Sequence, residues 1–286
     1  MDAFPIEPID PVAAFPSLAE LPQSPKKLFI RGTLASCKNK KYIAIVGSRA
    51  YTGYGALVCK TLIEGLRGYP VVIVSGLALG IDAIAHQTAL DCGITTIGFP
   101  GSGLSTSVLY PACHKELART ILERGGALIS EYGSMARAAY WTFPQRNRLV
   151  AGVADMVIVI EAKEKSGALI TARLGTEYNK IVGAVPGSIF SEPSKGTNWL
   201  LTLGAVPIRG PEDVIRELGL AAKDPLVSDV IVNDTEAKVL AFLDEPKTRE
   251  AVIQALQLSP TEAAVVFSTL EIKGLVTEVF GLLQKH

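Results

Sequence analysis

The sequence predicts an α/β protein with a doubly wound, mostly parallel sheet, followed by a small domain of a different kind. Two observations carry this prediction. Short apolar runs rich in Val and Ile alternate with helical segments from residue 41 to about residue 218, as in parallel sheets that helices cover on both faces. After residue 230 the alternation stops, and helical segments follow one another instead.

The strands and helices of the large domain are expected to alternate in order. The strands are an edge strand at 26–32, buried strands at 42–46, 71–74, 95–99, 127–129, 156–160 and 181–185, and a last strand at 205–208. The helices are expected at 55–66, 81–90, 112–123, 147–153, 167–179, 198–203 and 212–218. This order is typical of a Rossmann-like domain.

The ends of the chain differ in composition from this part. Residues 1–25 contain six prolines and little helical periodicity, which predicts an extended arm lying over the next domain. Lys223, Asp224 and Pro225 interrupt the pattern again and indicate a linker. We therefore divide the chain into four parts: an arm at 1–25, a large domain at 26–220, a linker at 221–230 and a small domain at 231–286.

The small domain resembles a winged helix, a variant of the helix-turn-helix. Three helical segments precede a short strand, at 236–243, 249–256, 260–273 and 274–279. Thr235, Thr248 and Ser259 are suitable N-caps for these helices. DNA recognition by such a domain needs a basic third helix, whereas this one is apolar and acidic. A protein contact or a packing role is therefore favoured over DNA binding.

The composition is that of an ordinary globular protein of roughly two domains, with 286 residues, 48% of them hydrophobic and 20% charged. No apolar run is long enough to span a membrane, and no secretory signal is visible, so we expect a cytoplasmic protein. The four cysteines are scattered and the three histidines lack metal-ligand spacing. We therefore expect reduced cysteines and no metal site.

The net charge of zero conceals an uneven distribution. Residues 1–222 hold 22 Lys and Arg against 18 Asp and Glu, whereas residues 223–286 hold 6 against 10. The excess in the large part permits a local basic groove.

The first buried strand ends in a turn that favours an anion. Gly47, Ser48 and Arg49 stand between this strand and the next helix, where free backbone N–H groups and the helix dipole attract a phosphate. Ser48 adds a hydroxyl donor, and Arg49 adds a permanent charge whose geometry matches phosphate oxygens. The alternative is that Arg49 caps a neighbouring helix.

Turns of similar composition follow other strands of the sheet. Their candidate ligand-binding residues are Ser75, Gly76, Gly101, Ser102, Gly103, Ser166 and Gly167. Carboxyl ends of parallel strands share one edge, and small residues let a ligand approach the backbone closely. We therefore expect one anionic ligand to be shared by these turns, although Gly and Ser are also ordinary turn residues.

Aromatic and basic residues gather between residues 140 and 148. The candidates among them are Phe143, Arg146, Asn147 and Arg148. This combination suits single-stranded nucleic acid, since rings stack on bases and guanidiniums hold phosphates. The alternative is a hydrophobic plug, with Asn147 as a helix N-cap and one arginine paired to Glu131 or Glu161.

No nucleophile with a neighbouring base stands out, so we predict no catalytic residue. Asp82 and His86 lie four residues apart on one helix face, and we expect them to form a structural pair. Glu161 ends a strand and is suited to act as a general base or to hold an arginine, the structural role being favoured.

Together these motifs resemble the DNA-processing protein A family (DprA, also called Smf) of natural transformation. The match runs from about residue 15 to residue 220. It rests on a specific series of motifs: IVGSR at 45–49, SGLALGID at 75–82, GSG at 101–103, FPQRNR at 143–148, SGALIT at 166–171 and VPG at 185–187.

The resemblance implies a cytoplasmic, usually dimeric protein that binds incoming single-stranded DNA and helps load the RecA recombinase. It implies neither catalysis nor a cofactor. It also implies that Arg49 is a principal DNA contact, with Phe143, Arg146 and Arg148 near the same groove. Lys180 departs from the family, because an arginine is common at this position; we include it among the candidate DNA contacts.

Two other functions remain open from the sequence. Nucleoside-monophosphate phosphoribohydrolases of the lysine-decarboxylase-like type have a similar fold and a Pro-Gly-Gly-x-Gly-Thr-x-x-Glu loop. The corresponding loop here, at 100–103, lacks the Thr and the catalytic Glu. A regulator that binds duplex DNA through the winged helix is the other alternative, and its acidic third helix counts against it.

Overall fold

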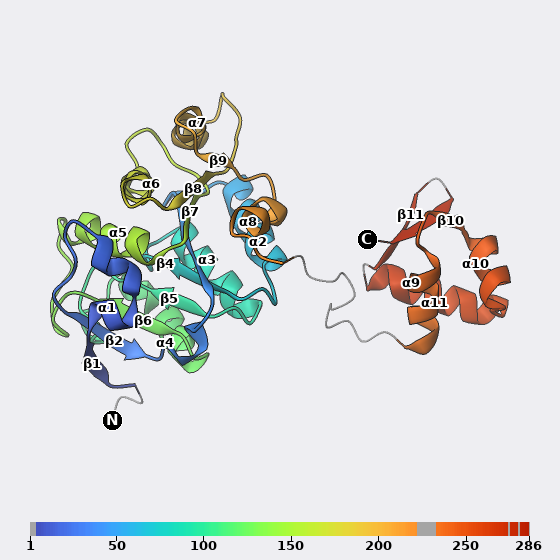
Figure 1. Cartoon of the computed structure of the whole chain (residues 1–286), viewed down its shortest axis with the longest axis horizontal. Helices are drawn as coiled ribbons and strands as arrows, with labels where there is room; N and C mark the ends of the chain where they lie inside the picture. Colours follow the sequence, from blue (N-terminus) through green and yellow to red (C-terminus); the bar gives the residue numbers. More distant parts are fainter. Residues whose placement is uncertain (1–3, 222–232, 274, 280, 286) are drawn as a thin grey trace. The chain divides into compact units, whose positions relative to one another are not determined.

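A computed structural model describes residues 4–221, 233–273, 275–279 and 281–285. The chain divides into two compact units, Met1–Ala222 and Lys223–His286, which are described separately (Figure 1). Of the expected linker at 221–230, only Ala221 lies within the described residues.

The first unit is built on a nine-stranded sheet in the order β1-β2-β6-β5-β4-β3-β7-β8-β9. These strands are β1 (Ile6–Ile9), β2 (Leu28–Gly32), β3 (Lys41–Val46), β4 (Val71–Ser75), β5 (Thr96–Gly98), β6 (Ala127–Ser130), β7 (Met156–Val159), β8 (Ile181–Ala184) and β9 (Val206–Pro207). The strands from β6 to β9 in this order run parallel, whereas β1 and β2 are antiparallel additions. The predicted Rossmann-like, mostly parallel sheet is confirmed.

Helices cover both faces of the sheet because its strands are apolar on both sides. Along β3, Ile43 and Ile45 pack in one core, and Ala44 and Val46 pack in another. The first core lies under α2 (Gly53–Gly65), α3 (Ile81–Asp91) and α8 (Pro211–Glu217), with α4 (Lys115–Glu123) beside α3. The second lies under α5 (Thr142–Val153), α6 (Gly167–Glu177) and α7 (Lys195–Thr202).

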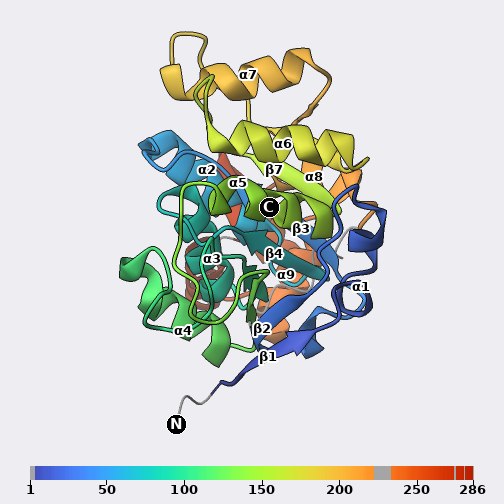
Figure 2. The same ribbon diagram turned by 90° about the vertical axis from the view of Figure 1, so that its left-hand side faces the viewer.

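The strand order reverses at β3, which pairs with β4 on one side and β7 on the other. Figure 2 shows the two ends of the sheet, with α6 and α7 at one end and β1 and β2 at the other. None of the described helices is long and apolar enough to cross a membrane.

The N-terminal segment is more structured than its prolines suggested. Instead of an extended arm it forms β1, α1 (Pro11–Ala14) and a 3-10 helix, η1 (Pro16–Glu20). Phe15 and Leu18 are buried in the core beside α5. Burial of these two side chains holds the segment on the domain. Because β1 pairs with β2, the strand we expected at the edge lies one position inside it.

The second unit has the element order α9 (Asp234–Phe242), β10 (Lys247–Thr248), α10 (Arg249–Leu256), α11 (Pro260–Ile272), β11 (Val276–Val279) and β12 (Leu282–Lys285). Its strands form an antiparallel sheet in the order β10-β12-β11. Val239, Phe267 and Leu270 belong to its separate core.

Two of the three expected N-caps in this unit are confirmed. Thr248 caps α10 and Ser259 caps α11. The first helix begins two residues earlier than expected, because Asn233 rather than Thr235 is its cap. Asn233 and Glu236 form a reciprocal capping box, which satisfies two backbone N–H groups.

Candidate functional site

The loops that follow the parallel strands meet at one edge of the sheet, near the reversal of strand order. The register places Val46, Val159 and Ala184 level with one another at the ends of β3, β7 and β8. A pocket opens at this edge, as is usual for doubly wound sheets. It is lined by Arg49, Gly76, Ala78, Leu79, Tyr110, Pro111, Phe143 and Arg146. Four of the predicted site residues are therefore brought together: Arg49, Gly76, Phe143 and Arg146.

Arg49 is the exposed cation of this pocket. Its guanidinium carbon lies 5.3 Å from the centroid of the Phe143 ring, and that ring lies 5.6 Å from the ring of Tyr110. A guanidinium over an aromatic face keeps its N–H groups available at its edges for an anion. The pocket thus presents a positive charge and two aromatic rings together.

The backbone that carries Arg49 is fixed by the start of α3. The N–H of Ile81 donates to the carbonyl of Ser48 at 3.2 Å. Gly80 has a φ of 84°, and a Cβ there would lie 2.3 Å from the same carbonyl, so only glycine fits. The Ser48 hydroxyl bonds to the backbone of Ala50, donating to its carbonyl at 2.9 Å and accepting from its N–H at 3.1 Å. Ser48 therefore shapes the turn that presents Arg49.

Arg146 is buried, with only 5% of its surface exposed. Its Nη1 donates to the carbonyls of Gly76 and Phe99, which joins the loops after β4 and β5. A Cβ on Gly76 would lie 2.1 Å from that nitrogen, so the glycine makes room for the guanidinium. Burial lowers the pKa of Arg146 to about 10, and the nearby charge of Asp82 opposes that shift. Arg146 therefore remains charged at neutral pH and forms the floor of the pocket.

Asp82 is a buried acid whose charge acts on this arginine. Its Oδ2 accepts from the N–H of Gly76 at 3.0 Å and from that of Ala78 at 3.3 Å. Burial raises the pKa of the Asp82 carboxyl, and Arg146 together with these N–H groups opposes the rise. Asp82 and Arg146 thus hold the loop after β4 from two sides.

The same loop contains a strained residue. Leu77 is fully buried and has a φ of 57°, a backbone conformation that residues other than glycine rarely adopt. Nδ1 of His114 lies 2.9 Å from the Leu77 carbonyl. Because a carbonyl only accepts, this nitrogen carries the proton. His114 thereby ties the loop after β4 to the segment that contains Tyr110.

The expected pair of Asp82 and His86 is wrong. Nδ1 of His86 lies 2.7 Å from the hydroxyl of Thr96, while Asp82 turns toward the loop after β4. Burial is the main cause that lowers the pKa of His86 to about 3, so this side chain is neutral. The two residues share a helix face but do not pair, because His86 bonds to Thr96 and Asp82 bonds to the backbone of the loop after β4.

The Arg148 and Asn147 side chains are engaged within the protein. Arg148 forms an ion pair with Glu131 and donates to the Gln23 carbonyl at 2.8 Å. This pairing confirms the structural alternative for one arginine. Asn147 lies inside α5, which begins five residues earlier, so its expected role as an N-cap is wrong. Its Oδ1 instead accepts from Nε of Arg146 at 3.2 Å.

The predicted serines at the strand ends form hydrogen bonds within the protein. Ser75 and Ser102 are fully buried. Ser75 donates to the Ile45 carbonyl at 2.6 Å, and the Ser102 hydroxyl accepts from the N–H of Tyr110 at 3.2 Å. Ser166 caps α6 by accepting from the N–H of Ala168 at 3.2 Å. Their hydroxyls shape the loops and the start of a helix.

The predicted glycines allow close contacts, with one exception. A Cβ on Gly47 would lie 2.7 Å from Ile81, one on Gly101 would lie 2.7 Å from the Phe143 ring, and one on Gly103 would lie 2.2 Å from the Gly133 carbonyl. Gly167, at the first turn of α6, has open space around it. That helix start is thus the one predicted glycine position with room for a ligand at its Cβ.

Lys180 does not lie with the rest of the predicted group. It directly precedes β8, and Ile181 is level with Met156 and with Ile43 near the amino ends of the neighbouring strands. Lys180 is therefore at the opposite edge of the sheet from the pocket. Its inclusion came from the resemblance, whereas the strand direction separates it from Arg49.

Glu161 has a structural partner, although not the arginine we considered. This buried carboxylate accepts from the N–H of Thr52 at 2.9 Å and from the Thr52 hydroxyl. It thus binds the N-cap residue of α2, where a negative charge is favoured.

Sequence reasoning missed Ala78, Leu79, Tyr110 and Pro111 as residues that line the pocket. Ala78 ends the predicted turn at 75–78 and Leu79 directly follows it, so extending the candidate residues along this loop would have found both. Tyr110 and Pro111 follow a segment without regular structure, and nothing in their local sequence placed them beside Phe143.

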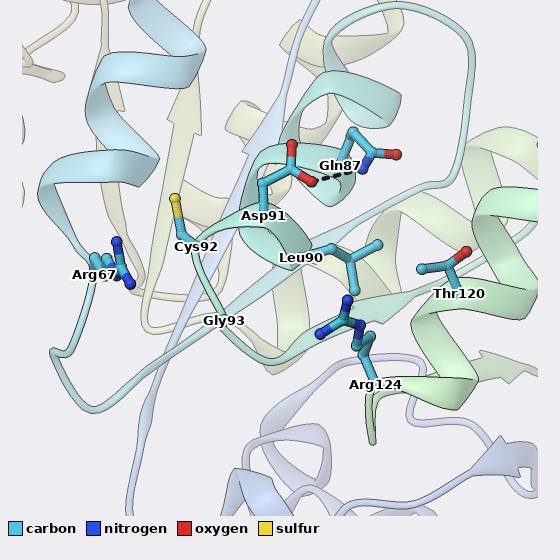
Figure 3. Close-up of a pocket in the computed structure, with 8 residues that line it drawn as sticks. All are labelled: Arg67, Gln87, Leu90, Asp91, Cys92, Gly93, Thr120 and Arg124. Carbon is cyan, nitrogen blue, oxygen red and sulfur yellow. Dashed lines mark hydrogen bonds between the residues drawn. The ribbon is translucent and has the colours of Figure 1, made fainter.

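A second hollow, of about 520 Å³, lies away from the predicted residues and is lined by Arg67, Gln87, Leu90, Asp91, Cys92, Gly93, Thr120 and Arg124 (Figure 3). Cys92 and Arg124 are the C-caps of α3 and α4. Helix C-termini carry partial negative charge, which opposes anion binding and explains arginines here. The amide of Gln87 donates to Asp91 at 2.9 Å. We assign this hollow no part in the candidate site.

The sheet and its pocket define a Rossmann-like α/β protein with a cationic and aromatic site at the point of strand reversal. The family model for DNA recombination-mediator protein A matches residues 11–219. The chain belongs to this family.

Individual relatives agree with this assignment. Protein Smf of Escherichia coli is 38% identical over 203 residues, which cover 71% of this chain but 54% of that protein. DNA processing protein DprA of Streptococcus pneumoniae is 41% identical over 200 residues, covering 70% of this chain and 69% of the relative. The match thus spans little more than half of the Escherichia coli relative.

Two solved structures have the same fold. The X-ray structure of the Streptococcus pneumoniae protein superposes with a TM-score of 0.68 at 39% identity, covering 76% of this chain and 75% of that one. A structure of DNA processing protein A from Helicobacter pylori, described for its single-stranded DNA binding mode, has a TM-score of 0.68 at 32% identity. It covers 76% of this chain and 96% of that one.

Proposed function

We propose that this protein binds single-stranded DNA, protects incoming DNA and loads the RecA recombinase in natural transformation and recombination. One observation carries the proposal: the exposed Arg49 guanidinium lies over Phe143, in a pocket at the point of strand reversal. A cation beside the exposed ring of Tyr110 and the half-buried ring of Phe143 suits a phosphate and the base attached to it. The Helicobacter pylori relative, described as binding single-stranded DNA, supports the same ligand class.

The pocket residues divide into contacts and supports under this proposal. Arg49 binds a phosphate, and the Phe143 and Tyr110 rings stack on a base. Gly167 has open space around it at the start of α6 and offers a place for a further phosphate, whereas the N–H of Ala168 is bonded to Ser166. Arg146 acts from the floor of the pocket, where its charge adds to the field while its N–H groups hold the loops. Arg148 and Lys180 are weaker candidates for DNA contacts because of their ion pair and position.

The direct test replaces Arg49. Arg49→Ala should weaken binding of labelled oligo-dT by about 1–3 kcal/mol, since a charge-assisted contact is lost. Arg119→Ala is a matched control, because Arg119 is an exposed arginine on α4 that pairs with Glu116 and Glu123. Unchanged affinity in a folded Arg49→Ala protein would remove Arg49 from the interface.

The chain acts without catalysis in this proposal. In the rival phosphoribohydrolase, a loop after a strand supplies a catalytic Glu, which the corresponding loop at 100–103 lacks here. The space above Gly101 is filled by the Phe143 ring, and Glu161, which follows β7, is bonded to Thr52. These contacts favour a binding site over a hydrolytic one.

A homodimer is the expected working form. Trp199 and Leu203 are exposed, four residues apart at α7, and Ile189 and Phe190 are exposed on the segment before it. Large apolar side chains of this kind are typical of surfaces that bind another protein. We infer that a second copy of the chain covers them. The reducing cytoplasm is the proposed location, in keeping with four cysteines that are all unpaired.

The second unit acts as a winged helix that contacts protein rather than DNA. Its order of helices and strands, with β11 and β12 as the wing, supports this assignment. In this unit, Arg249 at the start of α10 forms ion pairs with Glu271 and Glu278. Those pairs neutralise the charge that a DNA backbone would require.

A further inference from the structure

The segment between β6 and α5 exposes large aromatic side chains next to the pocket. On this segment Tyr140 is 92% exposed and Trp141, directly before α5, is 58% exposed. Isolated exposed apolar residues are common, but adjacent aromatic residues beside a ligand pocket indicate a contact surface.

Backbone hydrogen bonds fix this segment to the loop after β5. The N–H of Gly103 donates to the Ala136 carbonyl at 2.8 Å, and that of Ser105 donates to the Ser134 carbonyl at 3.0 Å. A Cβ on Gly103 would collide with the Gly133 carbonyl, so the glycine allows the two loop segments to lie close together. The segment is therefore part of the wall around the carboxyl edge.

Trp141 is held by a second aromatic ring while much of its surface stays exposed. The ring of Tyr132 lies 5.9 Å from it in an edge-to-face arrangement, with an interplanar angle of 80°. The Tyr132 hydroxyl lies 3.1 Å from the Thr142 carbonyl and 3.2 Å from Oε1 of Gln145. A ring that is already positioned loses little conformational entropy when it binds a ligand.

Trp141 lies close along the chain to Phe143, which lines the pocket. It stands two residues before Phe143, so their Cα atoms are at most about 7.6 Å apart. On the same segment, Arg137 is exposed and has no ion pair or hydrogen bond within the described part of the chain. Aromatic rings with a nearby cation are the usual components of a single-strand binding platform.

We propose that Trp141 and Tyr140, with Arg137, form a second station for the same single strand, where a base outside the Phe143 pocket stacks. The inference rests on the proposed function and extends it, because it gives the direction in which the strand leaves the pocket. A strand long enough to reach both stations should gain affinity that a very short oligonucleotide does not gain.

Tryptophan fluorescence tests the platform directly, because the chain contains two tryptophans, Trp141 and Trp199. In Trp199→Phe, the indole of Trp141 is the sole reporter, and oligo-dT should quench it as a base stacks. In Trp141→Phe, the remaining indole of Trp199 should not respond at equal saturation. Anisotropy of the labelled oligonucleotide shows in each case that the strand is bound.

The affinities provide an independent readout. Trp141→Ala should bind a long oligo-dT about tenfold more weakly, while Trp141→Phe should keep most of the affinity because a ring remains. Both variants should bind a trinucleotide as the wild type does. Circular dichroism checks that each variant is folded.

Two results would overturn the inference while leaving the proposed function intact. They are an unquenched Trp141 in the bound complex and wild-type affinity of Trp141→Ala for the long strand. Absence of any single-strand binding by the wild type would refute the proposed function, and the platform with it.

Discussion

Replacing Arg146 by Met should destabilise the first unit rather than selectively weaken DNA binding. The substitution removes the donor that joins the Gly76 and Phe99 carbonyls and leaves Asp82 buried without its opposing charge. A buried polar group left without its partner costs about 1–3 kcal/mol, and more where the group is charged, so we expect a loss of at least this size. Urea unfolding at neutral pH, followed by circular dichroism, measures this loss directly.

The pH dependence of this variant has a definite sign. Burial already raises the pKa of Asp82 in the folded protein, and loss of Arg146 raises it further. A carboxyl whose folded pKa exceeds its unfolded pKa binds more protons when folded. Its destabilising effect is thus greatest above the folded pKa and fades as the pH falls toward the unfolded value. Arg146→Met should therefore recover part of its lost stability as the pH falls from neutral toward the ordinary pKa of a carboxyl.

The double variant Asp82→Asn with Arg146→Met supplies the control. It removes both charges, so its loss of stability should be smaller than the sum of the two single losses. The reasoning fails if Arg146→Met unfolds within about 0.5 kcal/mol of the wild type. Normal stability with lost affinity would instead make Arg146 a direct DNA contact.

Three further predictions concern other parts of the chain. His114→Ala should lower the free energy of unfolding of the first unit by about 1 kcal/mol, because the carbonyl of the strained Leu77 loses its donor. His114→Asn should retain most of this stability, since the amide N–H of asparagine stands at the position of the histidine Nδ1. Equal losses of stability for the two variants in urea unfolding would refute the role of His114 as a donor to Leu77. Deleting residues 230–286 should leave the affinity for oligo-dT within about twofold, as expected if the acidic unit makes no phosphate contact. A larger loss in a folded protein would return that unit to the interface. Trp199→Glu with Leu203→Glu should convert a dimer to a monomer in light scattering, because two charges would be buried against apolar surface; an unchanged mass would place the interface elsewhere.

The sequence predicted the sheet well because its strands are apolar on both faces. The runs at 42–46, 71–74 and 156–160 admit no other assignment once helices alternate with them. The strand β1 was missed because it is short and contains Glu7 and Pro8, so neither alternation nor a β-branched run reveals it. Its pairing with β2 depends on tertiary contacts, which local pattern does not contain.

The site was predictable at Arg49 and Phe143 but not at Arg146. Arg49 follows a buried strand directly, so its place at the carboxyl edge follows from topology alone. Arg146 lies in the same aromatic and basic segment as Phe143. Its partners Gly76 and Phe99, however, are 70 and 47 residues away in the chain. Whether an arginine faces solvent or donates to buried carbonyls depends on how distant loops pack around it. Sequence spacing gives no account of that closure.

The claim that this pocket holds single-stranded DNA is tested most directly by fluorescence anisotropy with labelled oligo-dT and the matching duplex, each at two salt concentrations. The account predicts a strong preference for the single strand, with an affinity that falls as salt rises, because phosphate contacts release counterions. Equal or tighter binding of the duplex, or no binding to either, would contradict it.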